Sequence, residues 1–378
     1  MGFRRIAIVG VGLMGGSFAA ASKALPSPPQ VFGVDPDTES LSYARGQHII
    51  DDAATPQEAI EQGWFGPGGV DLVVLATPAR VAEEWLRILG ENEFDGVVTD
   101  VSSTKGHVID AAERFLGDAA AFVGGHPMAG SERSGVEAAR ADLFAGAYYV
   151  LTPTPTTDMD AYRRLHSYVA SLGARVVSVD AREHDEAVAI ISHVPHVTAS
   201  ALVELAKAHA GEGDELLRLA AGGFKDTTRI AAGSADLWTG ICIDNAPALS
   251  AGIDELREVL GEFAEMLRTA DTEAIRDWLA RAADVRRSLP AQWVPATEAL
   301  SELLIPVIDR PGVISEVTSA VGRARCNIEA IEIDHQSEDS AVLVLVLTDE
   351  GDMLALTEDL RSRGYDPRLR PLDAGTER

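Results

Sequence analysis

A single histidine stands among small residues in segment 124–135, which reads GGHPMAGSERSG. The segment follows an apolar, strand-like run at residues 121–123. Glycines let a ligand approach the backbone closely, and histidine is the side chain best suited to move a proton near neutral pH. The pattern indicates that His126 is the acid or base of a redox reaction whose other half lies elsewhere in the chain.

The N-terminus carries a pattern for that other half. A β-type run at residues 4–9 is followed by the turn GVGLMGGS and an alanine-rich helical stretch, and a second β-type run at 31–34 ends in Asp35. This order of strand, G-x-G-x-x-G, helix, strand and acidic residue is typical of a dinucleotide site. Asp35 would bind the adenosine ribose and repel a 2′-phosphate, which favours NAD over NADP. The residues expected to bind the cofactor are Gly10, Gly12, Leu13, Met14, Gly15, Asp35, Thr77 and Pro78.

Strand-like and helical runs alternate as far as residue 179, with further strands expected at 71–76, 97–101, 121–124, 148–151 and 175–179. This alternation predicts an α/β fold with a Rossmann-type, mostly parallel, doubly wound sheet. Thr77, Ser103 and His126 each fall just after a predicted strand. Because ligands of such sheets bind at the carboxyl ends of the strands, we expect these three residues to meet at one crevice.

Helical patterning replaces the strands between about residues 180 and 290, as in an all-helical domain that completes a substrate site and forms a dimer core. The stretch SHVPH carries His193 and His196, and the stretch GGFKDTTR carries Asp226 and Arg229, which share a face if helical. A packing role for the histidines and a surface ion pair for Arg229 are open alternatives. No H-E-x-x-H pattern or cysteine cluster supports a metal site, so none is expected.

The C-terminal part predicts a small separate module. After a linker at 291–297, β-type and helical runs follow in the order βαββαβ, with the turn DRPGV before the first helix. This order is ferredoxin-like. The predicted domains are therefore residues 1–179, 180–290 and 298–371.

Composition narrows the functional classes. The net charge of −27 argues against nucleic acid and against anionic membranes, both of which select basic patches. The two cysteines, Cys242 and Cys326, are far apart and indicate reduced thiols of a cytoplasmic protein. No segment is expected to reach the ~18 apolar residues of a membrane span.

Taken together, the motifs GVGLMGGS, DVSSTKG, GGHPMAGSERSG, ISHVPH and GGFKDTTRIA closely resemble the prephenate dehydrogenase family over about residues 1–290. The C-terminal module, with its DRPGV turn, resembles an ACT domain. The resemblance implies NAD-dependent oxidative decarboxylation of prephenate to 4-hydroxyphenylpyruvate, a step of tyrosine biosynthesis.

The resemblance also implies roles for individual residues. His126 removes the proton of the C4 hydroxyl as hydride leaves that carbon, and Ser103 assists the same hydroxyl and orients the histidine. Arg229 holds a substrate carboxylate, and His196 lies near the pyruvyl side chain. The expected substrate-binding residues are Arg229, His196, Asp226, Glu132 and His193.

Three alternatives stay open. Arogenate has an amino group where prephenate has a ketone; His196 suits the ketone, although Glu132 could hold an ammonium. A β-hydroxyacid dehydrogenase would use a lysine of the helical half, but would leave GGHP and SHVPH without a role. An inactive NAD- or amino-acid-sensing protein would not need an acid/base set at the strand ends.

For the ACT-like module the resemblance implies regulation by an aromatic amino acid, most simply tyrosine, bound at a subunit interface. Inhibition by tyrosine at the active site is the alternative. A helical second half together with such a module favours a homodimer or a higher even oligomer. The expected effector-binding residues are Asp309, Pro311, Gly312, Asn327 and Ile328.

Overall fold

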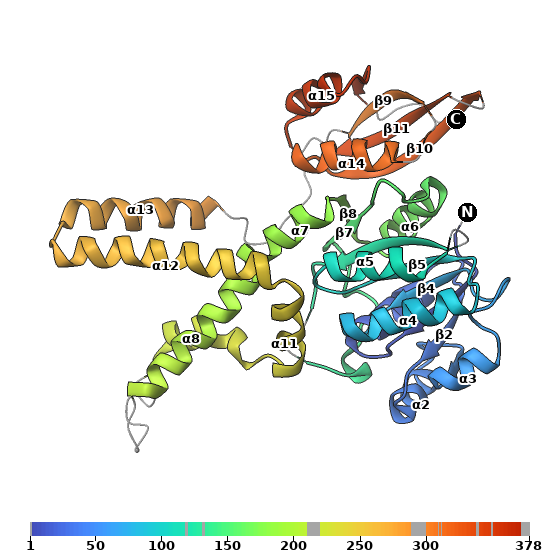
Figure 1. The fold of residues 1–378 in the computed structure, drawn as a ribbon, viewed down its shortest axis with the longest axis horizontal. Helices are drawn as coiled ribbons and strands as arrows, with labels where there is room; N and C mark the ends of the chain where they lie inside the picture. The colour runs from blue at the N-terminus through green and yellow to red at the C-terminus, as the bar shows by residue number, and fades with distance from the viewer. Residues whose placement is uncertain are drawn as a thin grey trace. The chain divides into compact units, whose positions relative to one another are not determined.

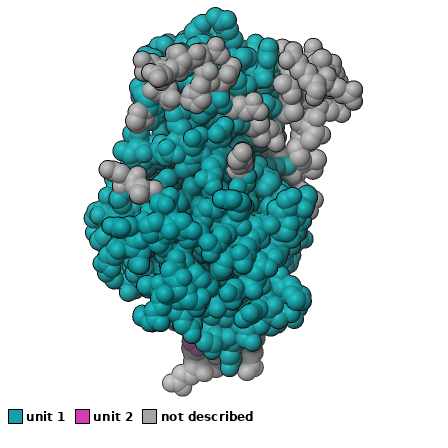
Figure 2. Space-filling view, turned by 90° about the vertical axis from the view of Figure 1, so that its right-hand side faces the viewer, with its two compact units in different colours: residues 1–184, 296–378 teal, residues 185–295 magenta. Residues whose placement is uncertain are grey.

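The structure, a computed structural model, describes residues 2–117, 120–130, 133–209, 220–288, 300–308, 310, 312–337, 340–348 and 351–371. The chain divides into two compact units, coloured in Figure 2: residues 1–184 with 296–378, and residues 185–295. The first unit contains an eight-stranded sheet and the C-terminal module, and the second unit is helical in its described part.

The eight-stranded sheet has the order β3-β2-β1-β4-β5-β6-β7-β8 (Figure 1). Neighbouring strands from β3 through β6 pair in parallel, which is the Rossmann arrangement, so the predicted fold class is confirmed. The strands are β1 (Arg5–Val9), β2 (Gln30–Val34), β3 (Asp52–Ala54), β4 (Leu72–Leu75), β5 (Val97–Asp100), β6 (Ala121–Pro127), β7 (Tyr148–Thr152) and β8 (Arg175–Ser178). The helices between them are α1 (Leu13–Lys23), α2 (Thr38–Gly46), α3 (Pro56–Glu61), α4 (Ala79–Glu91), α5 (Gly106–Phe115) and α6 (Met159–Ser171), with a 3₁₀ turn at Val136–Ala138.

The central strands are buried along almost their whole length because helices cover both faces of the sheet. In β4 every residue is buried, and Ile6 and Ile8 of β1 face one core while Ala7 and Val9 face the other. Polar residues at the strand ends are therefore the ones that can contact a cofactor or a substrate.

The sheet departs from the predicted parallel series at β6. This strand continues to Pro127 because it pairs antiparallel with β7, which sets His126 opposite Val150. β8 then runs parallel to β7. The prediction that a strand ends at Gly124 and that His126 follows it is wrong, because the partner that extends the ladder comes later in the sequence.

The helical unit is built on a 29-residue helix, Ala181–His209, whose first residues belong to the first unit. It consists of α7 (Ala181–Val188), a π-helical turn (Ala189–His193) and α8 (Val194–His209). Pro195 explains the turn, since proline clashes with the carbonyl four residues earlier and widens the helix there. The remaining elements are α10 (Gly222–Thr228), a 3₁₀ turn (Arg229–Ala232), α11 (Ala235–Asp244), α12 (Ala246–Arg268) and α13 (Thr272–Ser288).

By length and mean hydropathy the Ala181–His209 helix would be able to cross a membrane, which was not expected from the sequence. Buried core helices of soluble proteins meet the same criterion, and a third of its most apolar window is buried in the chain. His193 and His196 stand within that helix. The finding is thus weak evidence for a membrane protein.

The C-terminal module has the predicted βαββαβ order, with the strands paired antiparallel as β10-β11-β9-β12. Its elements are β9 (Leu300–Ile308), α14 (Val313–Arg323), β10 (Ile328–Ser337), β11 (Ser340–Thr348), α15 (Met353–Ser362) and β12 (Arg368–Pro371). Helix α14 contacts the first domain directly: Ser315 donates to the carbonyl of Pro153 at 3.1 Å. Buried residues of the module and of α6 and β8 form one continuous hydrophobic core.

Candidate active site

The glycine-rich turn between β1 and α1 is shaped for a close backbone approach. Gly10 has a φ of +93°, and a Cβ there would lie 2.4 Å from the carbonyl oxygen of Ala76. A Cβ on Gly15 would lie 2.0 Å from the carbonyl oxygen of Gly10, so only glycine fits at either position. At Gly12, the N-cap of α1, no described atom lies within 4 Å of a Cβ. This open N-terminus, where Leu13 and Met14 begin the helix, suits a phosphate.

Asp35 holds this turn in place. Its Oδ2 accepts the backbone N–H of Val11 at 2.7 Å, and its Oδ1 accepts that of Asp37 at 2.8 Å. Asp35 is half-buried at the end of β2, where a ribose is expected. The carboxylate therefore has a structural task beyond the cofactor contact expected from the sequence.

Two hydroxyls at the carboxyl ends of β4 and β5 are buried without a partner in the described structure. Thr77 follows β4, and its Cγ2 lies 2.9 Å from the position of a Cβ on Gly10. Within the described ranges, Thr77 Oγ1 and Ser102 Oγ have no hydrogen-bond partner. Pro78 is the exposed N-cap of α4. Buried hydroxyls normally find a partner, so these orphaned atoms and the open glycine turn fit a bound dinucleotide.

His126 is joined to a second histidine. Its Nδ1 lies 2.8 Å from Nε2 of His184 in α7, and the two rings meet edge to face with centroids 5.0 Å apart. His126 is half-buried and His184 is buried. Nothing local in the sequence indicates that these two residues, 58 positions apart, are in contact.

A buried ion pair braces the strand of His126. Lys105 Nζ binds a carboxylate oxygen of Asp100 and the carbonyl of Gly125, while the other Asp100 oxygen accepts the N–H of Gly125 at 2.9 Å. Neither charged side chain has any exposed area. Ser103, half-buried, lies between these two residues in the chain, at the carboxyl end of the strand next to β6. Sequence reasoning missed the pair, although the DVSSTKG motif contains both members.

The second unit contains its own histidine cluster. His196 stacks on Trp238 with centroids 3.5 Å apart, and burial lowers the pKa of His196 from its usual value. His193 is buried, and its Nδ1 lies 3.2 Å from Nδ2 of Asn245. Asn245 also donates to the carbonyl of Asp185 at 2.7 Å. The contact with Asn245 agrees with a packing role for His193, and the lowered pKa of His196 favours its neutral ring.

Two of the other expected substrate residues are not buried within the chain. Asp226 in α10 and Arg229, directly after it, are both exposed. Glu132 lies outside the described residues. In the ACT-like module, Gly312 has a φ of +88° and caps α14, while Asn327 and Ile328 are buried at the start of β10. Asp309 and Pro311 lie outside the described residues.

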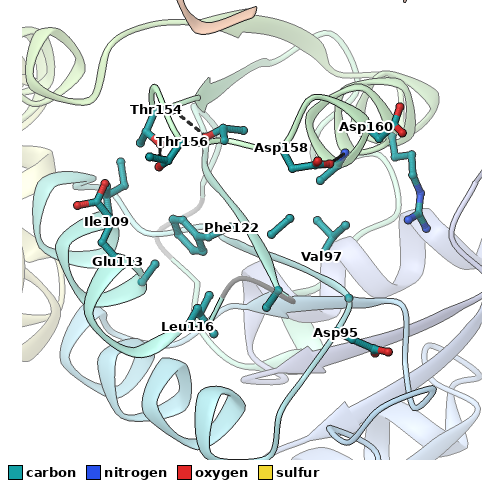
Figure 3. Close-up of a pocket in the computed structure, with 18 residues that line it drawn as sticks. Asp95, Val97, Ile109, Glu113, Leu116, Phe122, Thr154, Thr156, Asp158 and Asp160 are labelled. Atoms are coloured by element: carbon teal, nitrogen blue, oxygen red, sulfur yellow. Dashed lines mark hydrogen bonds between the residues drawn. The ribbon is translucent and has the colours of Figure 1, made fainter. Parts of the chain in front are cut away.

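The structure contains a cavity away from these residues. A space of about 720 Å³ lies at the amino ends of β5 and β6, beside α5 and the loop after β7 (Figure 3). Four carboxylates, of Asp95, Glu113, Asp158 and Asp160, and one arginine, Arg164, line it. Ser103 and His126 lie at the opposite ends of these strands, so the cavity is not the site of the expected chemistry. Among the described residues no group of three or more His, Cys, Asp or Glu could hold a metal ion.

The glycine turn, Asp35 and the histidine pair define a dinucleotide-dependent oxidoreductase. Known families then identify its three parts. The prephenate dehydrogenase nucleotide-binding domain matches residues 18–178, the prephenate dehydrogenase dimerization domain matches residues 180–281, and the ACT domain matches residues 301–364. The chain belongs to the prephenate dehydrogenase family, and the resemblance drawn from its motifs is confirmed.

Individual relatives agree with this assignment. Prephenate dehydrogenase of Bacillus subtilis is 36% identical over 338 residues, which cover 88% of this chain and 89% of that protein. The structure of A. aeolicus prephenate dehydrogenase in complex with hydroxyphenyl propionate and NAD+ has a TM-score of 0.72 at 32% identity, covering 77% of this chain and 99% of that one. Synechocystis arogenate dehydrogenase has a TM-score of 0.64 at 28% identity, covering 76% of this chain and 100% of that one.

Proposed function

We propose that the chain catalyses the NAD-dependent oxidative decarboxylation of prephenate to 4-hydroxyphenylpyruvate, a step of tyrosine biosynthesis in the cytoplasm. The observation that carries the proposal is the 2.8 Å contact between Nδ1 of His126 and His184. A catalytic histidine is characteristically held through one ring nitrogen while the other handles the substrate proton. The family and the nucleotide-binding domain support the same reaction.

The chemistry assigns one task to each group. Bound NAD supplies the hydride acceptor for the hydrogen on ring C4. His126 takes the proton of the C4 hydroxyl as that hydrogen leaves, with Ser103 orienting the hydroxyl. The electron pair of the bond to the ring carboxylate completes the aromatic ring as carbon dioxide departs, and the proton returns to the phenol oxygen. General-base help of this kind contributes roughly 10²–10⁴ in rate.

NAD is the cofactor, bound by Gly10, Gly12 and Gly15 with the N-terminus of α1 at the pyrophosphate. The A. aeolicus relative was crystallised with NAD+, which supports this assignment. The negative charge of Asp35 at the end of β2 disfavours the 2′-phosphate of NADP. Thr77 and Pro78 line the same turn from the end of β4.

Prephenate is a dianion, and a chain of net charge −27 must hold it with local cations. Arg229 holds one carboxylate in a charge-assisted contact, and Asp226 and Glu132 are the polar substrate-binding residues that act with it. His196, whose pKa burial lowers, presents a neutral ring to the pyruvyl ketone. His193 supports the same helix. A neutral partner suits a ketone better than an ammonium, which favours prephenate.

Arogenate is the second candidate substrate. The Synechocystis relative is an arogenate dehydrogenase, and it covers three quarters of this chain. The two substrates differ only at the side chain, so the same base and the same hydride acceptor would serve both. Glu132 would then hold the ammonium group.

The active form is a homodimer or a higher even oligomer formed through the helical unit. Residues 180–281 match a dimerization domain, and large apolar side chains on α8, α11, α12 and α13 are more than half exposed in the single chain. These are Leu205, Leu237, Ile243, Leu260, Leu267, Leu279 and Val285. Tyrosine inhibits through the ACT domain, bound near Gly312, Asn327 and Ile328 together with Asp309 and Pro311.

The test is a parallel assay of NADH formation with prephenate, arogenate or a 3-hydroxy acid, with and without tyrosine. We expect NADH from prephenate above all, with arogenate slower. His126→Asn should lower turnover by about 10²–10⁴ and leave NAD affinity nearly intact. The absence of NADH with both cyclohexadienyl substrates would refute the proposed function.

A further inference from the structure

His184 is the second member of the histidine pair, and the reaction above names it only as a contact of His126. It lies in the first turn of α7, and only 3% of it is exposed. Asp180 fixes the start of that helix: its carbonyl accepts the N–H of His184 at 2.8 Å, and its carboxylate accepts the N–H of Arg182 at 2.9 Å. The ring of His184 is thus held in place against His126 by its own helix.

The contact between the rings restricts how protons can be arranged. For Nε2 of His126 to accept a proton, the neutral ring must carry its hydrogen on Nδ1. That N–H then points at Nε2 of His184, 2.8 Å away, which must have a lone pair to accept it. A hydrogen bond of this kind fixes both the tautomer and the orientation of a catalytic histidine. It also becomes charge-assisted, and therefore stronger, when His126 gains the substrate proton.

We propose that His184 is a positioning residue for the dehydrogenation: as a neutral acceptor it holds His126 in the tautomer with hydrogen on Nδ1 and stabilises its protonated form. The proposal rests on the proposed role of His126 as base.

Other ionisable groups lie on the elements around this strand. Asp100 and Lys105 are buried against each other and bind the backbone of Gly125. On β7, burial and then the Asp100 carboxylate raise the pKa of Tyr149, so its phenol stays neutral. On α7, Glu183 is half-buried and precedes His184 in the chain. Nε2 of His184 lies 2.8 Å from Nδ1 of the His126 ring.

Three full-length variants separate positioning from packing. His184→Ala removes the acceptor, whereas His184→Gln places an amide oxygen at nearly the reach of the original Nε2. His166→Ala is the matched control, because His166 is an equally buried histidine of the same unit that packs on Tyr162 in α6. For each variant, kcat and KM for prephenate and NAD are measured across the pH range, and thermal unfolding reports folding.

We expect His184→Ala to lower kcat by about 10–100-fold, a part of the contribution that a general base makes, with KM for NAD little changed. The acidic limb of its kcat/KM profile should move to lower pH, because protonated His126 has lost its hydrogen-bond partner. His184→Gln should recover a large part of kcat, and His166→Ala should keep wild-type turnover. A purely structural residue would show neither the moved profile nor the rescue.

A wild-type kcat in His184→Ala would overturn the proposal. So would a lowered kcat with an unmoved pH profile and no recovery in His184→Gln. His126→Asn, measured in parallel, distinguishes the two levels of the argument. If it retains turnover, the proposed role of His126 fails and the role of His184 fails with it; if it is inactive while His184→Ala is unaffected, the positioning role alone is refuted.

Discussion

The carboxylate of Asp100 accepts the backbone N–H of Gly125 at 2.9 Å and so fixes the residue that precedes His126. Lys105 binds the same carboxylate and the carbonyl of Gly125, so both backbone groups of Gly125 are tied to a fully buried ion pair. The strand that carries the proposed base is therefore held by the loop that also carries Ser103. Any displacement of this ion pair should move His126 and so change the rate of the proposed reaction.

Lys105→Met should both destabilise the protein and lower turnover. The variant leaves a buried carboxylate without its partner, which typically costs about 3–5 kcal/mol. Urea unfolding gives the free energy of unfolding. Arg87→Ala is the control, since Arg87 forms an exposed pair with Glu91 one helical turn away and should cost less than about 1 kcal/mol. Equal losses of unfolding free energy in the two variants would show that the pair of Lys105 and Asp100 does not stabilise this strand.

Substitutions of Asp35 should separate its two tasks. Asp35→Asn keeps an oxygen for the N–H of Val11 but removes the negative charge. The preference for NAD over NADP should therefore fall by about tenfold or more, because a like charge costs on the order of 1–4 kcal/mol at close range. Asp35→Ala also releases the glycine turn, so both cofactors should bind more weakly. Steady-state KM values for NAD and NADP check this. An unmoved ratio in Asp35→Asn would mean that the charge does not select the cofactor.

The stack of Trp238 on His196 should control the titration of that histidine. Burial is what lowers the pKa of His196, so Trp238→Ala should raise it toward its usual value, and Trp238→Phe should raise it less. Histidine resonances followed by NMR against pH give both values. With His196 more often charged, KM for prephenate should change more than KM for NAD. Identical titrations in wild type and Trp238→Ala would contradict this reasoning.

The buried His166 should make stability depend on pH. Burial lowers its pKa from 6.5 to about 4. Between these two pH values the unfolded chain binds a proton at His166 and the folded chain does not. The free energy of unfolding is therefore highest above pH ~6.5 and falls as the pH drops toward ~4, by about 3 kcal/mol in total. His166→Phe keeps a ring on Tyr162 and removes the titration. Urea unfolding at pH 7 and 5 should show a larger loss for wild type than for the variant, and equal losses would refute the assignment.

Much of the fold could be predicted from local patterns in the sequence. The glycine turn, the acidic residue that ends β2 and the order of the C-terminal elements depend on neighbours in sequence, and each was predicted correctly. The antiparallel β6–β7 ladder was missed, because Gly125 and His126 look like a loop until their partners in β7 are known. The pairing of His126 with His184 was missed for the same reason, because sequence spacing does not show a hydrogen bond between residues far apart in the chain.

The candidate site was predicted by residue type more than by arrangement. A histidine between glycines can be identified as a proton carrier from its chemistry alone. Its environment, made by Asp100, Lys105 and His184, comes from two other segments, the DVSSTKG motif and α7. The role of Trp238 likewise could not be predicted until the structure placed it in a stack with the ring of His196.

The last prediction concerns how the ACT domain reaches the histidine pair. A Cβ on Gly322 in α14 would lie 2.2 Å from the carbonyl oxygen of Ser178, the last residue of β8. The chain runs from Ser178 through Asp180 into α7 and His184. A shift of α14 would therefore move the start of the helix that holds His126. This contact offers a direct path from the tyrosine site proposed above to the base.

Gly322→Val should wedge α14 away from β8 and weaken this path. The tyrosine concentration that halves activity should rise by about tenfold, which corresponds to ~1.4 kcal/mol of coupling. Leu354→Ala, at a largely exposed position of α15 in the same module, should leave inhibition unchanged. If Gly322→Val is inhibited like the wild type, and added prephenate relieves the inhibition, tyrosine acts by competing at the active site. The α14 contact with Ser178 then serves packing alone.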